Sequence, residues 1–93
     1  MKLSIIGAGT MGSTWARNAA KLAGVQPAGV CDLIEERAER YAQLCGTSAY
    51  TDMDEMIAKE KPDVAVVCLP TYLHKSAVLK LAAQGIHVIC EKP

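Results

Sequence analysis

Short apolar runs alternate with longer amphipathic segments along the whole chain. The short runs are rich in Val, Ile and Leu, which is typical of buried β-strands, whereas the longer segments carry apolar residues at helical spacing. The predicted strands are residues 2–6, 25–31, 48–50, 64–69 and 86–90. The predicted helices are residues 11–23, 33–45, 53–59 and 72–84. This alternation predicts βαβ units with right-handed crossovers, and hence an α/β fold built on a parallel sheet with helices on both faces.

The boundaries of the predicted helices carry supporting signals. Gly24, Gly46 and Gly85 stand where helix C-caps are expected, and Pro27 interrupts the second strand. In a doubly wound sheet of the Rossmann type, with strand order 3-2-1-4-5-6, the sixth strand would come after Pro93. We therefore expect one domain over residues 1–93 that is C-terminally incomplete, truncated before its sixth strand.

A glycine-rich turn joins the first predicted strand to the first predicted helix. Gly7 permits a tight turn, Gly9 permits close approach of a pyrophosphate, and Gly12 permits close packing of the helix on the sheet. The amides of Thr10, Met11 and Gly12 would lie at a helix N-terminus, where aligned peptide dipoles favour negative charge. A turn of this kind can simply connect a strand to a helix, but its setting between strand and helix favours a dinucleotide-binding site.

Asp32 follows the second predicted strand at the distance from the turn that a ribose-binding acid requires. Its carboxylate can accept hydrogen bonds from the ribose hydroxyls of NAD. It would also repel the 2′-phosphate of NADP, by about 3 kcal/mol per charge pair at about 5 Å and an effective dielectric of about 20. NAD is therefore the expected cofactor, with NADP less favoured. Alternatively, Asp32 could cap the next helix, because Asp32 and Glu35 have capping-box spacing. Arg37 and Arg40 on that helix could also weaken the preference for NAD by pairing with a phosphate.

Composition excludes several other classes of function. Ten basic and ten acidic residues give no net charge, which does not match the basic footprint of a nucleic-acid binder. The longest apolar stretch, residues 64–70, is too short to cross a bilayer, and the chain begins directly with a predicted strand rather than a signal peptide. Cys31, Cys45, Cys68 and Cys90 lack CxxC spacing, so we expect buried thiols in a cytoplasmic protein and no metal site.

Two further motifs follow the fourth and fifth predicted strands. The first, residues 69–74, reads Leu-Pro-Thr-Tyr-Leu-His, and the second is Glu91-Lys92-Pro93. Together with the glycine turn and Asp32, these motifs resemble the N-terminal NAD(P)-binding Rossmann domain of the glucose-fructose oxidoreductase and inositol 2-dehydrogenase (Gfo/Idh/MocA) family. The resemblance covers the whole chain, and the run from residue 85 to residue 93 is more specific than the glycine turn alone.

The resemblance implies a nicotinamide-binding half of the site. Leu69, Pro70, Thr71 and His74 would line it, although family members often have Thr and Asn where this chain has Leu69 and Thr71. From the residues alone, Thr71 could instead cap the following helix, and His74 could be a packed or solvent-facing helix residue. His87 lies within a predicted strand and is interpreted as structural.

The resemblance also implies a reaction. Lys92 would be the catalytic residue, hydrogen-bonding a substrate oxygen or relaying its proton, and Glu91 would orient Lys92 or contact the nicotinamide ribose. The parent enzyme would be an NAD-dependent dehydrogenase of sugars, cyclitols or related polyols, whose substrate contacts come from a second α/β domain absent from these residues. We expect the chain alone to be inactive and to self-associate as a homo-oligomer. The alternative is a non-catalytic NAD-sensing or interaction module on the same fold.

Overall fold

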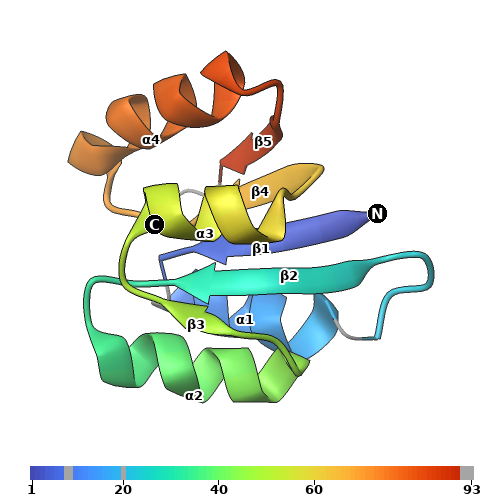
Figure 1. Ribbon diagram of the computed structural model, residues 1–93. Coiled ribbons are helices and arrows are strands. Elements are labelled where there is room, and N and C mark those ends of the chain that lie inside the picture. Colours follow the sequence, from blue (N-terminus) through green and yellow to red (C-terminus); the bar gives the residue numbers. More distant parts are fainter. Residues whose placement is uncertain (8–9, 20, 91–93) are drawn as a thin grey trace.

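The computed structural model describes residues 1–7, 10–19 and 21–90 of the chain. Strands and helices alternate throughout, so the predicted α/β fold is confirmed (Figure 1). The strands are β1 (Lys2–Ile6), β2 (Gln26–Cys31), β3 (Ala49–Tyr50), β4 (Val64–Val67) and β5 (His87–Cys90). The helices are α1 (Thr10–Ala19), α2 (Glu35–Cys45), α3 (Met53–Glu60) and α4 (Thr71–Ala83).

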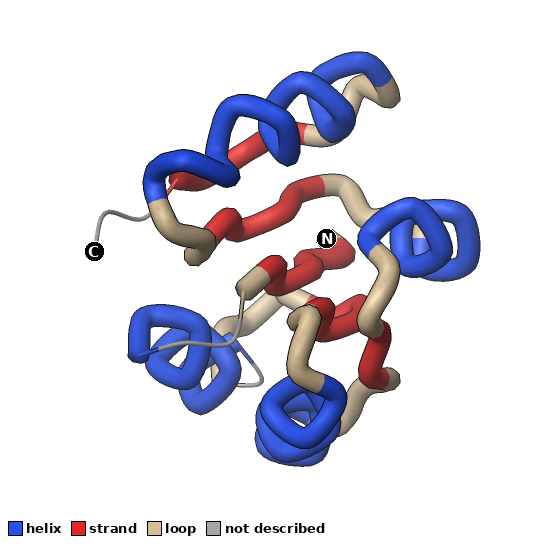
Figure 2. The backbone as a smooth tube through the Cα atoms, turned by 90° about the vertical axis from the view of Figure 1, so that its left-hand side faces the viewer, coloured by secondary structure: helices blue, strands red, loops and turns tan. Residues whose placement is uncertain are grey.

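The strands form one parallel sheet in the order β3-β2-β1-β4-β5. From β1 the chain first builds outward through β2 to β3, then returns to the other side of β1 with β4 and β5. This reversal places a topological switch point between β1 and β4, where open α/β sheets bind their ligands. Helices α1 and α2 cover one face of the sheet, and α3 and α4 cover the other (Figure 2).

Each face of the sheet has a hydrophobic core, and alternate side chains of β1 contribute to both. Leu3 and Ile5 pack with Ala16 and Ala42 beneath α1 and α2, whereas Ile6 packs beneath α3 and α4. Every residue of β4 is buried because that strand lies inside the sheet and is covered on both faces. This explains why its sequence is a continuous apolar run rather than an alternating one.

The second strand contains a β-bulge. Leu3 pairs with Pro27 and Ile5 with Val30, so β2 has one residue more than β1 between these pairs. Pro27 was predicted to interrupt this strand, but it lies inside β2. Its missing N–H is tolerated because β3 pairs only with Val30 and Cys31, beyond the proline.

Several predicted helix ends differ from the structure. Helix α1 ends at Ala19, and residues 21–24 form turns, so Gly24 does not cap it. Gly46 caps α2 in the left-handed conformation, as predicted, whereas Gln84 caps α4 and Gly85 follows with a positive φ. Helix α3 ends at Glu60, and Lys61 caps it with a φ of 48°. None of the helices, within the described residues, is long and apolar enough to span a membrane.

Candidate functional site

The carboxyl ends of β1, β2 and β4 meet at the switch point of the sheet. Gly7 follows β1 there with a φ of 91°, and its amide donates to the Cys31 carbonyl oxygen at 2.8 Å. A Cβ atom at Gly7 would lie 2.9 Å from the backbone carbonyl carbon and oxygen of Cys68. The turn therefore needs glycine both for its conformation and for the close approach of the β4 end.

Gly12 brings helix α1 onto this turn. A Cβ atom at Gly12 would lie 2.2 Å from the Gly7 carbonyl oxygen, a distance that no side chain can occupy. Thr10 and Met11 form the start of α1, and the first turn of that helix has no acidic residue. Their amides therefore lie at a helix N-terminus, where the peptide dipoles favour an anion. Gly9, the remaining predicted glycine of the motif, lies outside the described residues.

Asp32 lies at the end of β2, beside the glycine turn. Its amide donates to the Tyr50 carbonyl oxygen at 3.0 Å, and its Oδ1 accepts a hydrogen bond from the Ile34 amide at 2.8 Å. Helix α2 begins at Glu35, with Ile34 as its N-cap residue and no side-chain cap, so the capping-box alternative for Asp32 is wrong. The carboxylate instead closes a two-residue turn, which also explains why α2 begins later than predicted.

An apolar cavity of about 240 Å³ adjoins Asp32. Its volume is below the approximately 300–1,000 Å³ of pockets that enclose whole drug-sized ligands, so it has room for only part of such a ligand. Leu69, which the resemblance assigns to the nicotinamide half of the site, lies in this wall together with Asp32. The full lining is Ile6, Cys31, Asp32, Leu33, Thr51, Met53, Leu69, Leu73, Ser76 and Ala77.

Sequence reasoning missed most of these lining residues. Leu33 is 82% exposed, yet it directly follows the predicted ribose-binding acid. Thr51 and Met53 follow the short third strand, and Leu73 lies within the motif of residues 69–74. A signal was available, because the carboxyl ends of parallel strands lie at one edge of the sheet.

The thiol of Cys31 forms part of the cavity wall. Burial raises its pKa to about 11, and the nearby negative charges of Asp32 and Asp52 act in the same direction. The thiol therefore stays protonated at neutral pH, and this part of the wall is uncharged.

The motif after β4 is placed at the start of helix α4. The N-cap residue is Pro70, with no side-chain cap, so the alternative that Thr71 caps the helix is wrong. His74 lies in the first turn of α4, and its Nε2 atom is buried with no hydrogen-bond partner. Such an atom usually has a partner, so it marks a place where a polar group would be stabilised. Glu91 and Lys92 lie outside the described residues.

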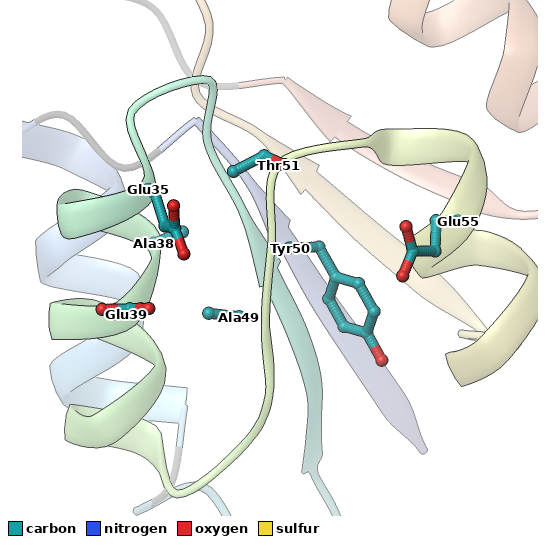
Figure 3. A pocket seen from close by; sticks show the side chains of 7 residues that line it. All are labelled: Glu35, Ala38, Glu39, Ala49, Tyr50, Thr51 and Glu55. Atoms are coloured by element: carbon teal, nitrogen blue, oxygen red, sulfur yellow. The ribbon is translucent and has the colours of Figure 1, made fainter.

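A second hollow, of about 190 Å³, lies beside β3. Figure 3 shows Glu35 and Glu39 on α2 at one side of β3, with Tyr50 and Glu55 at the other side. The Tyr50 hydroxyl donates to Glu60 at 2.5 Å, and this bond raises the pKa of Tyr50 to about 12. The carboxylates make this hollow unsuitable for a pyrophosphate. Across the described ranges, no cluster of three or more His, Cys, Asp or Glu residues could hold a metal ion.

Comparison with solved structures supports this fold. A myo-inositol dehydrogenase from Corynebacterium glutamicum superposes with a TM-score of 0.91 at 30% identity, covering 100% of this chain and 28% of the other. GenD2 from gentamicin A biosynthesis, solved in complex with NAD, superposes with a TM-score of 0.93 at 27% identity, covering 100% of this chain and 27% of the other.

Sequence comparison agrees. An inositol 2-dehydrogenase from Mycolicibacterium smegmatis is 35% identical over 95 aligned residues, which cover 100% of this chain and 28% of that protein. The chain spans about a quarter of the length of the curated relatives it matches. The family described as "Oxidoreductase family, NAD-binding Rossmann fold" matches residues 1–93. The chain therefore belongs to the Gfo/Idh/MocA oxidoreductase family and is built on its NAD-binding Rossmann fold.

Proposed function

We propose that this chain binds NAD(H) in preference to NADP(H), as the cofactor domain of a dehydrogenase. The reaction would move a hydride between the cofactor and a hydroxyl or carbonyl group of a sugar, cyclitol or related polyol. The observation that carries the proposal is the position of Asp32 between the glycine turn and the apolar cavity. The cyclitol dehydrogenases among its relatives support the substrate class.

The described residues fit the adenosine half of the cofactor. Gly7 and Gly12 keep the turn free of side-chain atoms at a helix N-terminus, which suits a pyrophosphate. Asp32 would accept hydrogen bonds from the adjacent ribose. The apolar walls formed by Leu33, Leu69 and neighbouring residues would enclose the adenine ring. A 2′-phosphate would meet the Asp32 carboxylate, which is why we expect NADP to bind more weakly.

The nicotinamide half would lie along Pro70, Thr71 and His74. The buried Nε2 atom of His74 would gain a hydrogen-bond partner there. When bound, the nicotinamide ring supplies or accepts the hydride. Lys92 would hold the substrate oxygen by a hydrogen bond and stabilise charge on it, with Glu91 orienting Lys92. We expect the main substrate contacts to come from a second domain and this chain, assayed alone, to turn over no polyol.

Titration calorimetry of the chain with NAD⁺ and NADP⁺ tests the proposal. We expect tighter binding of NAD⁺ and, in Asp32→Ala, a loss of most of the preference, about tenfold or more in the ratio of dissociation constants. Glu39→Ala is the matched control, because it removes one negative charge from α2 outside the apolar cavity. Tighter binding of NADP⁺, or no binding of either cofactor at millimolar concentration, would contradict the proposal.

A further inference from the structure

We propose that Ser4 and Thr47 are positioning residues for cofactor selectivity, because they hold the β-bulge that sets the position of Asp32. The inference rests on the proposed preference for NAD. Neither residue lines the apolar cavity, so both would act through the backbone of β2.

The bulge shifts the register between the two halves of β2. Before it, Pro27 pairs with Leu3, and after it Val30 pairs with Ile5 and Cys31 with Ile6. Two residues of β2, Ala28 and Gly29, therefore lie opposite the single residue Ser4. A bulge of this kind takes backbone groups out of the regular ladder, and these groups need other partners.

Two side-chain hydroxyls supply those partners. Ser4 is fully buried, and its Oγ donates to the Ala28 carbonyl oxygen at 2.5 Å. The Gly29 amide donates to Thr47 Oγ1 at 2.9 Å. Ser4 comes from β1 and Thr47 from the segment that leads into β3, so the bulge is held by β1 and by this segment.

Gly29 allows the backbone of the bulge to adopt its conformation. It has a φ of 97°, and a Cβ atom there would lie 2.9 Å from Met56 Cγ of helix α3. A side chain would therefore meet both backbone strain and a packed neighbour. The bulge is therefore supported by one glycine and two hydroxyl groups.

Loss of the bulge would move the residues that follow it. With Pro27 kept opposite Leu3, Val30 would come to lie opposite Ile6 instead of Ile5. A shift of one residue turns each following side chain to the other face of the sheet. Asp32 would then be displaced from the place where its amide meets Tyr50 and its carboxylate meets the Ile34 amide.

The test is the ratio of the dissociation constants of NADP⁺ and NAD⁺, measured by calorimetry for Ser4→Ala and Thr47→Val. We expect each variant to lose at least about fivefold of the wild-type preference for NAD⁺. Thr47→Ser keeps an oxygen in place and should retain the wild-type ratio. Ile57→Val, a substitution on the buried side of α3 that leaves both hydroxyls of the bulge in place, is the stability control and should also retain the ratio.

Several outcomes separate this inference from the proposed function. A wild type without preference for NAD⁺ contradicts the proposed function, and this inference falls with it. A wild type that prefers NAD⁺, together with folded Ser4→Ala and Thr47→Val variants that keep its ratio, overturns the inference alone. If Ser4→Ala does not fold, Thr47→Val decides. NMR contacts between Ile5 and Val30 in the cofactor-free chain give a second readout, and we expect them to weaken in Thr47→Val.

Discussion

In the sequence, strands β2 and β5 are both followed directly by a predicted site residue, Asp32 and Glu91, but the two strands are held differently. β2 pairs with β1 and β3, and its last four residues are buried. β5 pairs with β4 within the described residues, Ile89 is 39% exposed, and Cys90 is also exposed. Asp32 is thus held by hydrogen bonds to other described residues. Among the described residues, β5 pairs with β4 alone. Under the proposed function, adenosine recognition and the later chemistry would therefore depend on different parts of the structure.

The largest effect on cofactor affinity is expected at the glycine turn, which is hydrogen-bonded to the end of β2. Gly12→Ala should weaken NAD⁺ binding by about a hundredfold or more, because the new Cβ would lie 2.2 Å from the Gly7 carbonyl oxygen. Calorimetry measures the affinity, and circular dichroism checks the fold. The control is Gly24→Ala, whose added Cβ meets no atom within 4 Å, so that it carries only the backbone strain of a φ of 78°. Wild-type affinity in Gly12→Ala would show that the turn does not bind the cofactor.

A smaller effect is expected from the cavity next to Asp32. Leu33→Ser should weaken NAD⁺ binding by about five- to tenfold, because part of the apolar contact with adenine is lost. Its melting temperature should change little, since Leu33 is 82% exposed. Leu79→Ser is the matched control, because Leu79 is 60% exposed on α4 and lies outside the cavity. An equal loss of affinity in both variants would remove the cavity from the site.

We expect the chain to self-associate through β5, which lies at one edge of the sheet. An exposed strand edge with apolar side chains favours pairing with a second copy. Sedimentation over a concentration series should show association, and Ile89→Lys should weaken it by about fivefold while leaving NAD⁺ affinity unchanged. A strictly monomeric wild type at high micromolar concentration would show that this edge is protected.

The smallest effect is expected in the pH dependence of stability. The folded state raises the pKa of Cys31 from 9.0 to about 11, so between these values the unfolded chain releases a proton that the folded chain keeps. Stability should therefore fall as pH rises through this window, by up to about 1.4 kcal/mol per pH unit for this thiol. Denaturant titrations of Cys31→Ala should show a shallower fall than wild type. If Cys90→Ala, which removes the exposed thiol of β5, flattens the curve equally, Cys31 is not the cause.

The sequence predicts the sheet well because its signals are local. The spacing between the glycine turn and Asp32, and the apolar run of β4, identify strand ends without knowledge of the fold. The cavity lining could not be predicted in the same way, because Leu33, Met53 and Leu69 line one cavity only after the ends of β2, β3 and β4 are brought together. The apolar pair Leu33 and Ile34 also imitates the start of a helix, although both side chains are exposed.

The bulge escaped prediction for a different reason. A glycine inside a strand, such as Gly29, can indicate a bulge, but a proline in the same run, Pro27, indicates an interruption of the strand. The hydroxyls that satisfy the bulge come from Ser4 and Thr47, which are distant from Gly29 in sequence. Their role follows from pairing across strands, which no local pattern records.

Strand β3 contributes only two residues to the sheet, and this brevity has a consequence for local unfolding. Around this strand, the Val30 amide donates to the Ser48 carbonyl oxygen, and the Asp32 amide donates to the Tyr50 carbonyl oxygen. Detachment of this segment would release Asp32 and Thr51 together, without disturbing the pairing of β1 with β4. A ligand that binds only while β3 is attached lowers the population of the detached state, and it does so more strongly as its concentration rises above its dissociation constant. Proteolytic cleavage near β3 would therefore slow as NAD⁺ is added.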